Sequence, residues 1–316
     1  MNIGSFEMES PVMNAGGMVK SVEDVRAMAQ TGVGAILGGS FTLESRIGNS
    51  PNGQTVYYVD SATGITYNSL GMPNQGFKAL AQQLQEMMAI AHDHGKPFIL
   101  NMAPVSGNPS QEVLDMLGIL TAAGIESLDG VELNASCPNV ISEDGKNHEI
   151  LSHHPDKLEE VLFELSDVYN NELPIGFTTV RISPFRTRND TLDLARVLKN
   201  AGVDAVSAFN TFIVDVPVDE HGQKRLQIDA AKCGASGPGM ASQAEAQTSW
   251  LVEARDYVGG DFKIIGSNGI SDAASVVRRL DIGADVVGLS TSFFESQNWQ
   301  TTIAKLLDDL VELQDQ

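Results

Sequence analysis

The sequence predicts a (β/α)8 barrel, or TIM barrel, built as a single domain over residues 1–316. Short apolar runs alternate with longer amphipathic stretches along the chain, which is typical of βαβ units and a parallel sheet. A second observation is a recurring transition, seen at 31–37, 200–206 and 281–287, in which a helix ends at glycine and a strand follows at once. Third, no Gly-x-Gly-x-x-Gly follows the first strand, which disfavours a dinucleotide-binding doubly wound sheet.

The expected strands are short apolar runs, often rich in β-branched residues and bounded by polar or glycine-rich turns. In chain order they are 35–37, 98–101, 130–133, 176–182, 205–208, 263–266 and 286–289. The expected helices are the intervening stretches in which apolar residues recur at helical spacing. They are 22–30, 76–94, 111–123, 154–170, 190–200, 243–257, 273–280 and 299–313. No proline- or serine-rich linker interrupts this order, so we expect one domain.

Two segments interrupt the alternation. Residues 46–71 are polar and tyrosine-containing, and we expect them to form a long loop or hairpin over the barrel mouth. Residues 214–239 contain a turn at 219–222 between two short β-like runs. Because active sites of such barrels lie at the carboxyl ends of the strands, we expect both insertions to cover that face.

Composition limits the class of partner. The formal net charge of −21 repels nucleic acid and anionic membranes, so we expect neither as a partner. The first residues lack a signal-peptide pattern, and no run of about 18 apolar residues predicts a membrane span, so we expect a cytoplasmic protein.

Cys137 and Cys233 are the only cysteines, and they indicate neither a disulfide framework nor a metal site. The histidines also lack metal-site spacing, so we expect no metal.

The sequence changes abruptly from burial to polar chemistry in segment 130–139. An apolar strand leads into Asn134, Ser136, Cys137 and Asn139. A buried thiol is usually an inert small hydrophobic group. Cys137, however, is expected in a mouth loop, where a well-placed or partly ionised thiol can act as a general base. Cys233 has no such context, and we expect it to be structural.

Amide side chains gather at the expected strand ends and mouth loops. They are Asn68, Asn101, Asn134, Asn139 and Asn210, the last followed by Thr211. Each alone is typical of a turn or a cap. Because an amide donates and accepts hydrogen bonds in fixed directions, the group together suits a flat heterocycle with alternating carbonyl and N–H groups.

Small residues follow the last two expected strands. Segments 264–270 and 287–292 each present backbone N–H groups, and segment 234–239 could add a third wall. Loops after the seventh and eighth strands of such barrels commonly bind phosphate. The pair therefore predicts a phosphorylated ligand.

Two segments, 68–74 (Asn-Ser-Leu-Gly-Met-Pro-Asn) and 132–139 (Glu-Leu-Asn-Ala-Ser-Cys-Pro-Asn), are the most specific part of a wider resemblance. Segments 42–49 and 207–211 support it. In these motifs the chain resembles the dihydroorotate dehydrogenases, in particular the soluble class 1A enzymes. The resemblance implies a cytoplasmic, homodimeric, FMN-containing barrel of pyrimidine biosynthesis that oxidises dihydroorotate to orotate and uses fumarate as its electron acceptor.

The resemblance also implies roles for individual residues. Cys137 takes the position of the catalytic base, which removes a proton from C5 of dihydroorotate while hydride passes from C6 to flavin N5. The implied substrate-binding residues are Asn68, Leu70, Gly71, Met72, Asn134, Asn139, Asn210 and Thr211. The implied cofactor-binding residues are Ala15, Gly16, Gly39, Ser40, Asn101, Asn134, Arg181, Ser236, Gly237, Gly266, Asn268, Gly269, Ser290 and Thr291.

Three positions depart from the family pattern. Gly39 replaces a lysine that contacts the flavin and lies near the substrate carboxylate, so a cation beside a developing anion is lost. Arg181 replaces a second flavin-contacting lysine and keeps the charge on a bulkier, forked group. Asn268 stands where glycine is usual.

These departures leave three interpretations open. In the first, Arg181 supplies the missing charge and dihydroorotate is still oxidised. In the second, the FMN barrel acts on another dihydropyrimidine or an enone-like molecule. In the third, the chain is a flavin-binding or regulatory relative with little turnover. A non-flavin barrel that binds a sugar phosphate would explain the phosphate loops but not the asparagines.

Overall fold

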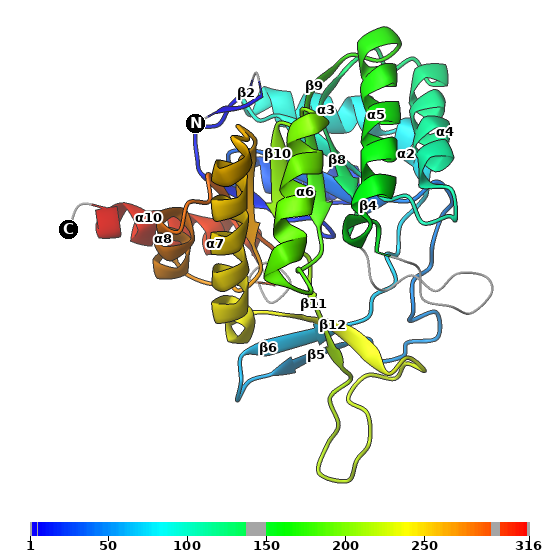
Figure 1. Ribbon diagram of the computed structural model, residues 1–316. Coiled ribbons are helices and arrows are strands. Elements are labelled where there is room, and N and C mark those ends of the chain that lie inside the picture. The colour runs from blue at the N-terminus through cyan, green and yellow to red at the C-terminus, as the bar shows by residue number, and fades with distance from the viewer. Residues whose placement is uncertain (1, 5, 137–149, 292–297, 315–316) are drawn as a thin grey trace.

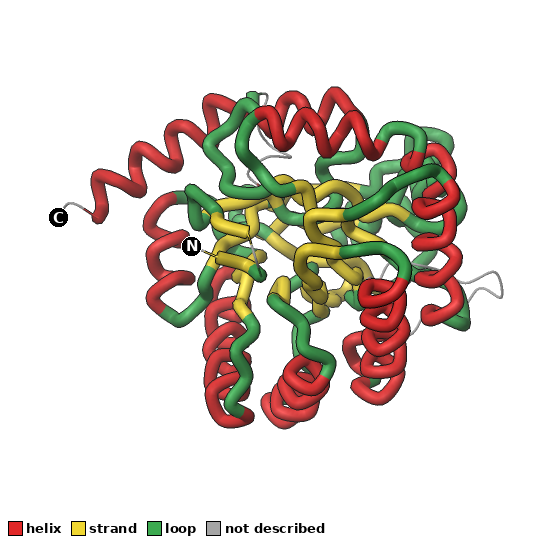
Figure 2. Tube along the Cα trace, turned by 90° about the horizontal axis from the view of Figure 1, so that it is seen from above, coloured by secondary structure: helices red, strands yellow, loops and turns green. Residues whose placement is uncertain are grey.

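The centre of the computed structural model is a parallel eight-stranded barrel surrounded by helices, and the model describes residues 2–4, 6–136, 150–291 and 298–314 (Figures 1 and 2). Its strands run in the order β3-β14-β13-β10-β9-β8-β7-β4. Their bounds are β3 (Val12–Asn14), β4 (Ile36–Phe41), β7 (Phe98–Met102), β8 (Leu128–Asn134), β9 (Ile175–Ile182), β10 (Ala205–Ala208), β13 (Lys263–Ser267) and β14 (Val286–Leu289). The predicted (β/α)8 barrel is confirmed.

The side chain of Asn14 joins β3 to β4. Its amide nitrogen donates to the carbonyl oxygen of Leu37 at 2.8 Å, and its Oδ1 accepts from the amide of Leu37 at 2.9 Å. The side-chain amide therefore takes the place of a peptide group in the strand ladder. The sequence did not indicate β3 as a strand, because three residues are too few to show an alternation.

The helices follow the predicted order. They are α1 (Val22–Ala29), α2 (Phe77–Ala81), α3 (Leu84–Asp93), α4 (Pro109–Ala122), α5 (Pro155–Asn171), α6 (Arg188–Asn200), α7 (Ala241–Val258), α8 (Ala273–Asp281) and α10 (Trp299–Gln314), with short 3-10 turns η1 (Leu151–His153) and η2 (Pro238–Met240). Capping boxes begin α1 at Ser21, α6 at Thr187 and α8 at Asp272. The expected helix 76–94 is divided in two, because the amide of Gln83 donates to Leu80 in a tighter i−3 bond that ends α2. Among the described residues, no helix has the length and hydropathy needed to span a membrane.

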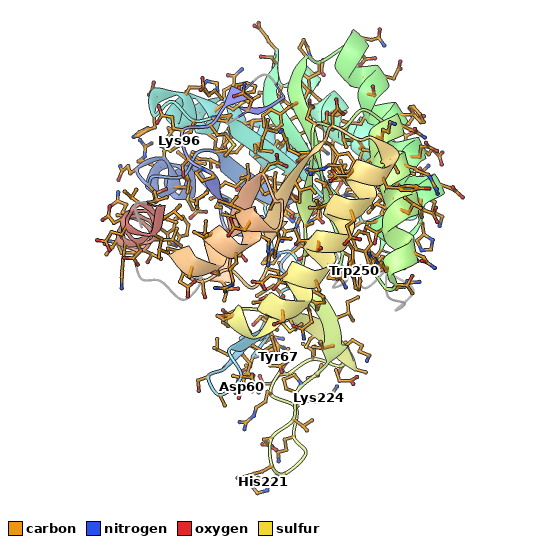
Figure 3. The ribbon with its side chains drawn as sticks, turned by 60° about the vertical axis from the view of Figure 1, so that its left-hand side comes forward. Asp60, Tyr67, Lys96, His221, Lys224 and Trp250 are labelled. Atoms are coloured by element: carbon orange, nitrogen blue, oxygen red, sulfur yellow. The ribbon has the colours of Figure 1, made fainter. Side chains whose placement is uncertain are left out.

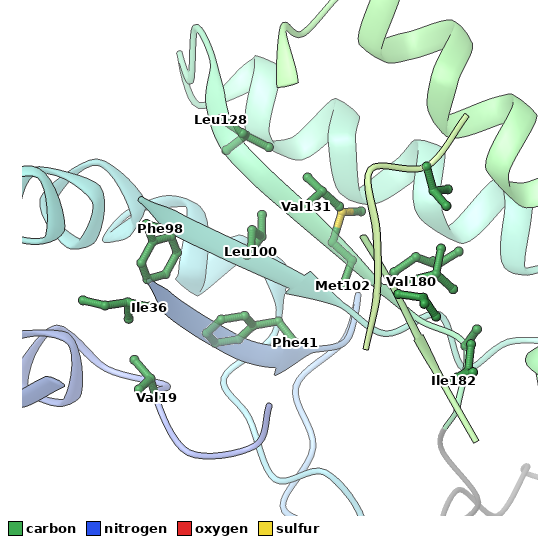
Figure 4. Close-up of a cluster of buried hydrophobic side chains, with 14 of the residues drawn as sticks. Val19, Ile36, Phe41, Phe98, Leu100, Met102, Leu128, Val131, Val180 and Ile182 are labelled. Carbon is green, nitrogen blue, oxygen red and sulfur yellow. The ribbon is translucent and has the colours of Figure 1, made fainter. Parts of the chain in front are cut away.

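The barrel strands separate an inner from an outer apolar layer, because successive side chains point to opposite faces. Ile36 belongs to the outer layer beneath the helices, and Leu37 belongs to the inner one. Figure 4 shows the outer layer, where Ile36 and Phe98 pack with neighbouring side chains of β4 and β7. At the amino-terminal end, the hairpin of β1 (Asn2–Ile3) and β2 (Phe6–Glu7) contributes Ile3 to the inner layer. The ring of Phe6 meets Phe177 edge-on at 5.5 Å between centroids.

The two predicted insertions combine into one antiparallel sheet below the barrel (Figure 1). The first forms β5 (Tyr57–Asp60) and β6 (Ile65–Asn68), and the second forms β11 (Phe212–Asp215) and β12 (Lys232–Ser236). They join where β6 pairs with β12, with Asn68 opposite Gly234. The β11–β12 connection projects away from the barrel, with His221 near its far end (Figure 3). This sheet and the carboxyl ends of the barrel strands enclose the site described next.

Candidate active site

A pocket of about 830 Å³, part of it open to solvent, lies where the barrel strands end against the four-stranded sheet. Most of the residues predicted to bind a substrate line it: Asn68, Leu70, Gly71, Met72, Asn134, Asn210 and Thr211. So do several of those predicted to bind a cofactor: Gly16, Ser40, Arg181, Ser236, Ser290 and Thr291. Cys137 and Asn139, predicted as base and substrate contact, lie outside the described residues.

Other predicted cofactor residues are not among those that line the pocket. They are Ala15, Gly39, Asn101, Gly237, Gly266, Asn268 and Gly269. Asn268 is joined to the lining, because its side-chain amide donates to the backbone oxygen of Asn210 at 3.2 Å. Asn101 is fully buried one strand away from Ser40.

Two asparagines organise the end of β8. The amide nitrogen of Asn134 donates to Ser40 Oγ at 2.8 Å, and its Oδ1 accepts from Ser136 Oγ at 2.7 Å. The amide nitrogen of Asn210 donates to the same Ser136 Oγ at 2.9 Å. Ser136 is fully buried. Ser136, the last described residue before the gap at 137–149, is therefore held by side chains from the ends of β8 and β10.

A buried carboxylate joins three of the barrel strands. Glu132 of β8 accepts hydrogen bonds from the side chains of Asn101 and Ser207, and it is 1% exposed. Burial raises the pKa of the Glu132 carboxyl, while the nearby Arg181 and both hydrogen bonds oppose the rise. The sequence placed Glu132 in a matched motif without giving it a role. The structure shows that it accepts hydrogen bonds from β7 and β10 and so orients Asn101 and Ser207.

Arg181 brings a positive charge to the pocket wall from β9. It is 7% exposed, and its Nη2 donates to Asn210 Oδ1 at 3.4 Å. A Cβ atom at Gly16 would lie 2.8 Å from Arg181 Nη1 and 3.1 Å from Asn101 Nδ2. A side chain at position 16 would therefore collide with the guanidinium of Arg181.

The position of the missing lysine has no room for a side chain. Gly39 has φ +115°, and a Cβ atom there would lie 2.7 Å from the carbonyl oxygen of Asn101 and 3.0 Å from the amide of Phe41. An L-residue rarely adopts this conformation. The backbone conformation of β4 therefore requires glycine at position 39, where the family pattern has lysine.

Five lining residues were not predicted as site residues: Gly17, Lys20, Tyr57, Thr66 and Pro73. Lys20 is the chemically notable one. Its Nζ donates to the carbonyl oxygen of Pro73 at 2.7 Å. Burial lowers the pKa of Lys20, and Asp24 opposes the change. It lies in the β3–α1 loop, where the sequence indicated only the approach to a helix.

The loop after β13 is held from behind by Arg279 of α8. Its Nη1 donates to Ser267 O at 2.8 Å and its Nη2 to Asn268 O at 3.0 Å. The N–H of a trans peptide points opposite to its carbonyl. The amides of Asn268 and Gly269 therefore point away from α8. Asn268 has φ +68° and Gly269 has φ +75°, and a turn whose successive amides point the same way is a common anion-binding arrangement.

Comparisons with known proteins show the family of the chain. A family model described as dihydroorotate dehydrogenase matches residues 1–311. The catalytic subunit of dihydroorotate dehydrogenase B (NAD(+)) from Desulforamulus reducens is 28% identical over 305 residues, which cover 93% of this chain and 87% of that protein. Dihydroorotate dehydrogenase A (fumarate) from Lactobacillus helveticus is 26% identical over 301 residues, covering 94% and 88%.

A solved structure gives the same result for the fold. It is described as DHODH in complex with ferulenol from Eimeria tenella, and it matches with a TM-score of 0.78 at 17% sequence identity. The match covers 99% of this chain and 84% of that chain. At this identity the likeness establishes the shared barrel. The relatives include both fumarate and NAD(+) types, so the family match assigns no electron acceptor.

Proposed function

Since the chain belongs to the dihydroorotate dehydrogenase family, we propose that it is an FMN-dependent oxidoreductase that oxidises dihydroorotate to orotate in pyrimidine biosynthesis. The observation that carries the proposal is the convergence of three amides, Asn68, Asn134 and Asn210, on one pocket that also holds two cations. Amides suit the alternating carbonyl and N–H groups of a dihydropyrimidine. The cations Lys20 and Arg181 suit its carboxylate.

The residues present fit a phosphorylated flavin. Asn101 Oδ1 and Thr211 Oγ1 are buried and have no hydrogen-bond partner within the described part of the chain. Buried polar atoms of this kind are normally satisfied, so a ligand is a natural partner for them. The amides of Asn268 and Gly269, which point away from α8, would hold the phosphate together with Ser290 and Thr291. Bound FMN would supply the two-electron acceptor for a C–C bond oxidation.

The remaining roles fall to the chain's own side chains. We propose Cys137 as the base that takes the proton from C5 of the substrate, because it follows the anchored Ser136 directly. Asn68, Asn134 and Asn210 would orient the ring, together with Thr211. Glu132 would keep the underlying network in place. Leu70, Gly71 and Met72 lie where they would cover the substrate.

Loss of the family lysine at Gly39 favours a second candidate. A pocket without that cation could accept a different dihydropyrimidine or an enone-like molecule. The two candidates differ in whether dihydroorotate reduces the flavin. Anaerobic mixing of the FMN-loaded protein with dihydroorotate, and separately with dihydrouracil, distinguishes them. Bleaching of the visible flavin band by dihydroorotate alone supports the first, and bleaching only by the other compound rejects it.

The cysteines provide a matched pair for the base. Cys137→Ser should leave FMN bound and slow flavin reduction by dihydroorotate by about 10²-fold or more, the usual range for a lost general base. In Cys233→Ala, dihydroorotate should reduce the flavin at the wild-type rate, because Cys233 lies in the small apolar cluster of the four-stranded sheet. Equal rates in Cys137→Ser and wild type would remove Cys137 from the mechanism.

We further propose a cytoplasmic homodimer that reoxidises its flavin with fumarate. The anaerobically reduced protein is mixed with fumarate and, separately, with NAD(+). Fast reoxidation by fumarate alone supports the proposal, and reoxidation by NAD(+) through an added electron-transfer subunit contradicts it. Sedimentation of the purified protein at the mass of one chain would contradict the dimer.

A further inference from the structure

We propose that a groove between α6 and α7 is a second binding site, which takes an uncharged, flat nitrogen heterocycle. The groove has a volume of about 960 Å³, part of it open to solvent, which is the size of ordinary small-molecule sites. Its lining comes from the first half of α6 and the second half of α7, and it shares no described residue with the pocket at the strand ends. The inference therefore does not depend on the reaction at the barrel mouth.

Aromatic side chains on one face of α7 form a wall of the groove. Trp250, which Figure 3 shows on this helix, and Tyr257 are seven residues apart, so two helical turns place both on the same side. Trp250 is half-buried, and Tyr257 is 77% exposed. Ala254 lies between them on the same face and is buried, and its methyl group leaves the space between the two rings open. A flat ring system can stack against such side chains.

A buried hydroxyl group at the floor of the groove lacks a hydrogen bond. Thr191 of α6 is 1% exposed and lines the groove, and its Oγ1 forms no hydrogen bond with any described residue. A threonine within a helix can donate to the carbonyl oxygen four residues earlier. Thr248 on α7 does so, with 2.7 Å between its Oγ1 and Ala244 O. Because buried polar atoms are normally satisfied, the Thr191 hydroxyl points to a ligand that supplies the missing hydrogen bond.

The charged groups around the groove are already paired. Arg188 forms an ion pair with Glu253 across the two helices, and Asp193 pairs with Arg196 at 2.9 Å. The net charge of −21 on the whole chain also opposes an anionic ligand. The groove therefore offers aromatic surfaces and neutral hydrogen-bonding groups, which are the hydroxyl at its floor and the side-chain amide of Asn189. These groups suit the N–H and carbonyl edge of a pyrimidine or a similar heterocycle.

A second copy of the chain is the main competing occupant, because exposed aromatic side chains are also common at protein interfaces. The structure favours a small ligand because the unsatisfied hydroxyl of Thr191 lies at the floor of a concave groove, whereas the ring of Tyr257 is exposed at its rim. A broad protein surface would contact the rim, and a flat small molecule can reach the floor.

The test measures the binding of uridine, an uncharged pyrimidine nucleoside, through the fluorescence of Trp250. The chain has two tryptophans, so Trp299→Phe leaves Trp250 as the only one. Uridine should quench this fluorescence saturably in the FMN-loaded protein, and uridine 5′-monophosphate should bind more weakly because of its charge. Excess orotate, which occupies the barrel mouth under the proposed function, should not displace uridine.

Two substitutions locate the bound uridine. Tyr257→Ala should weaken uridine binding at least about fivefold, the loss expected when a base loses one stacking partner. Thr191→Val keeps the shape of the side chain without its hydroxyl and should weaken binding about 2- to 10-fold. The matched controls are Phe163→Ala, which removes an exposed ring from α5, and Thr248→Val, which removes a bonded hydroxyl from α7. Both controls should leave the dissociation constant unchanged.

Urea unfolding without uridine gives an independent check on the hydroxyl. Thr191→Val should leave the urea midpoint unchanged or raise it, because valine replaces a buried hydroxyl that lacks a hydrogen bond. Thr248→Val should lower the midpoint, because its hydroxyl bonds to Ala244 O. A lower midpoint in Thr191→Val would show that this hydroxyl is already satisfied, and the inference would then lose its basis.

The other outcomes are equally decisive. A Trp250 signal that uridine does not quench, or equal affinity in wild type, Tyr257→Ala and Thr191→Val, contradicts the inference. Displacement of uridine by orotate would place uridine at the barrel mouth and contradict it as well. If Tyr257→Ala halves the mass in sedimentation and leaves uridine affinity unchanged, the groove is a contact between two copies. If the uridine effects appear and dihydroorotate is not oxidised, the proposed function is wrong and this inference stands.

Discussion

Removing Arg279 should disconnect the phosphate-binding loop from the helix behind it. Arg279 is 1% exposed, and its two terminal nitrogens hold the carbonyl oxygens of Ser267 and Asn268. Burial lowers the pKa of Arg279 to about 10, with Glu245 opposing the change, so the guanidinium remains charged at neutral pH. Arg279→Met keeps the apolar stem and removes both donors.

The size of the effect follows from the two carbonyl oxygens. Each buried acceptor that loses its donor costs about 1–3 kcal/mol, so the pair costs about 2–6 kcal/mol. Arg279→Met also removes the unfavourable burial of a charged guanidinium, and this offsets part of the loss in stability. We therefore expect Arg279→Met to lower the free energy of unfolding by about 3 kcal/mol. The freed loop should also hold the FMN phosphate less well.

Two measurements check this expectation. Urea titration gives the change in the free energy of unfolding. Quenching of flavin fluorescence gives the dissociation constants for FMN and for riboflavin, which lacks the phosphate. We expect FMN to bind at least about tenfold more weakly to Arg279→Met and riboflavin to bind as it does to wild type. The matched control is Arg278→Met, one residue earlier on α8, where an exposed arginine pairs with Glu245 at 3.3 Å and should contribute less than about 1 kcal/mol.

An Arg279→Met protein as stable as Arg278→Met would refute the role assigned to the two hydrogen bonds. Equal losses for FMN and riboflavin would refute the specific link between Arg279 and the phosphate loop. A loss for FMN alone would support that link.

Gly39→Ala should lower the free energy of unfolding by about 1–3 kcal/mol, because its Cβ would meet the carbonyl oxygen of Asn101 at φ +115°; an unchanged urea midpoint would contradict this. Burial raises the pKa of Cys233 to about 11, so its thiol stays protonated at pH 8, and iodoacetamide should label it only after unfolding; labelling of Cys233 in the native protein would be the contrary result. Orotate affinity should fall as pH rises through the lowered pKa of Lys20, below its usual 10.5, because only the ammonium form attracts the carboxylate. In Lys20→Arg the affinity should persist to higher pH, and an identical pH profile in both proteins would count against Lys20.

The barrel could be predicted from local pattern because most of its strands and helices have their own periodicity. The expected strands 205–208 and 286–289 match β10 and β14 residue for residue. β3 was not predicted, because it has only three residues and joins β4 through the side chain of Asn14, a contact between residues far apart in the sequence. The four-stranded sheet was not predicted as one unit, because it depends on Asn68 pairing with Gly234, far along the chain.

The site residues that lie at the ends of barrel strands could be predicted from the sequence. Asn134 and Arg181 belong to neighbouring parallel strands, whose carboxyl ends must meet at one edge. Lys20 gave no such signal, because its side chain enters the pocket from a loop and its partner Pro73 lies in another loop. Arg279 was likewise missed, since its sequence position on α8 indicates only a helix.

Single-turnover reduction of the bound flavin tests most directly whether this barrel removes two hydrogens from dihydroorotate. Anaerobic protein loaded with FMN is mixed with dihydroorotate, and the visible flavin absorbance is followed together with the appearance of orotate. We expect the flavin to bleach with one orotate formed per flavin. A flavin that dithionite bleaches and dihydroorotate leaves oxidised, with no orotate formed, would contradict the claim.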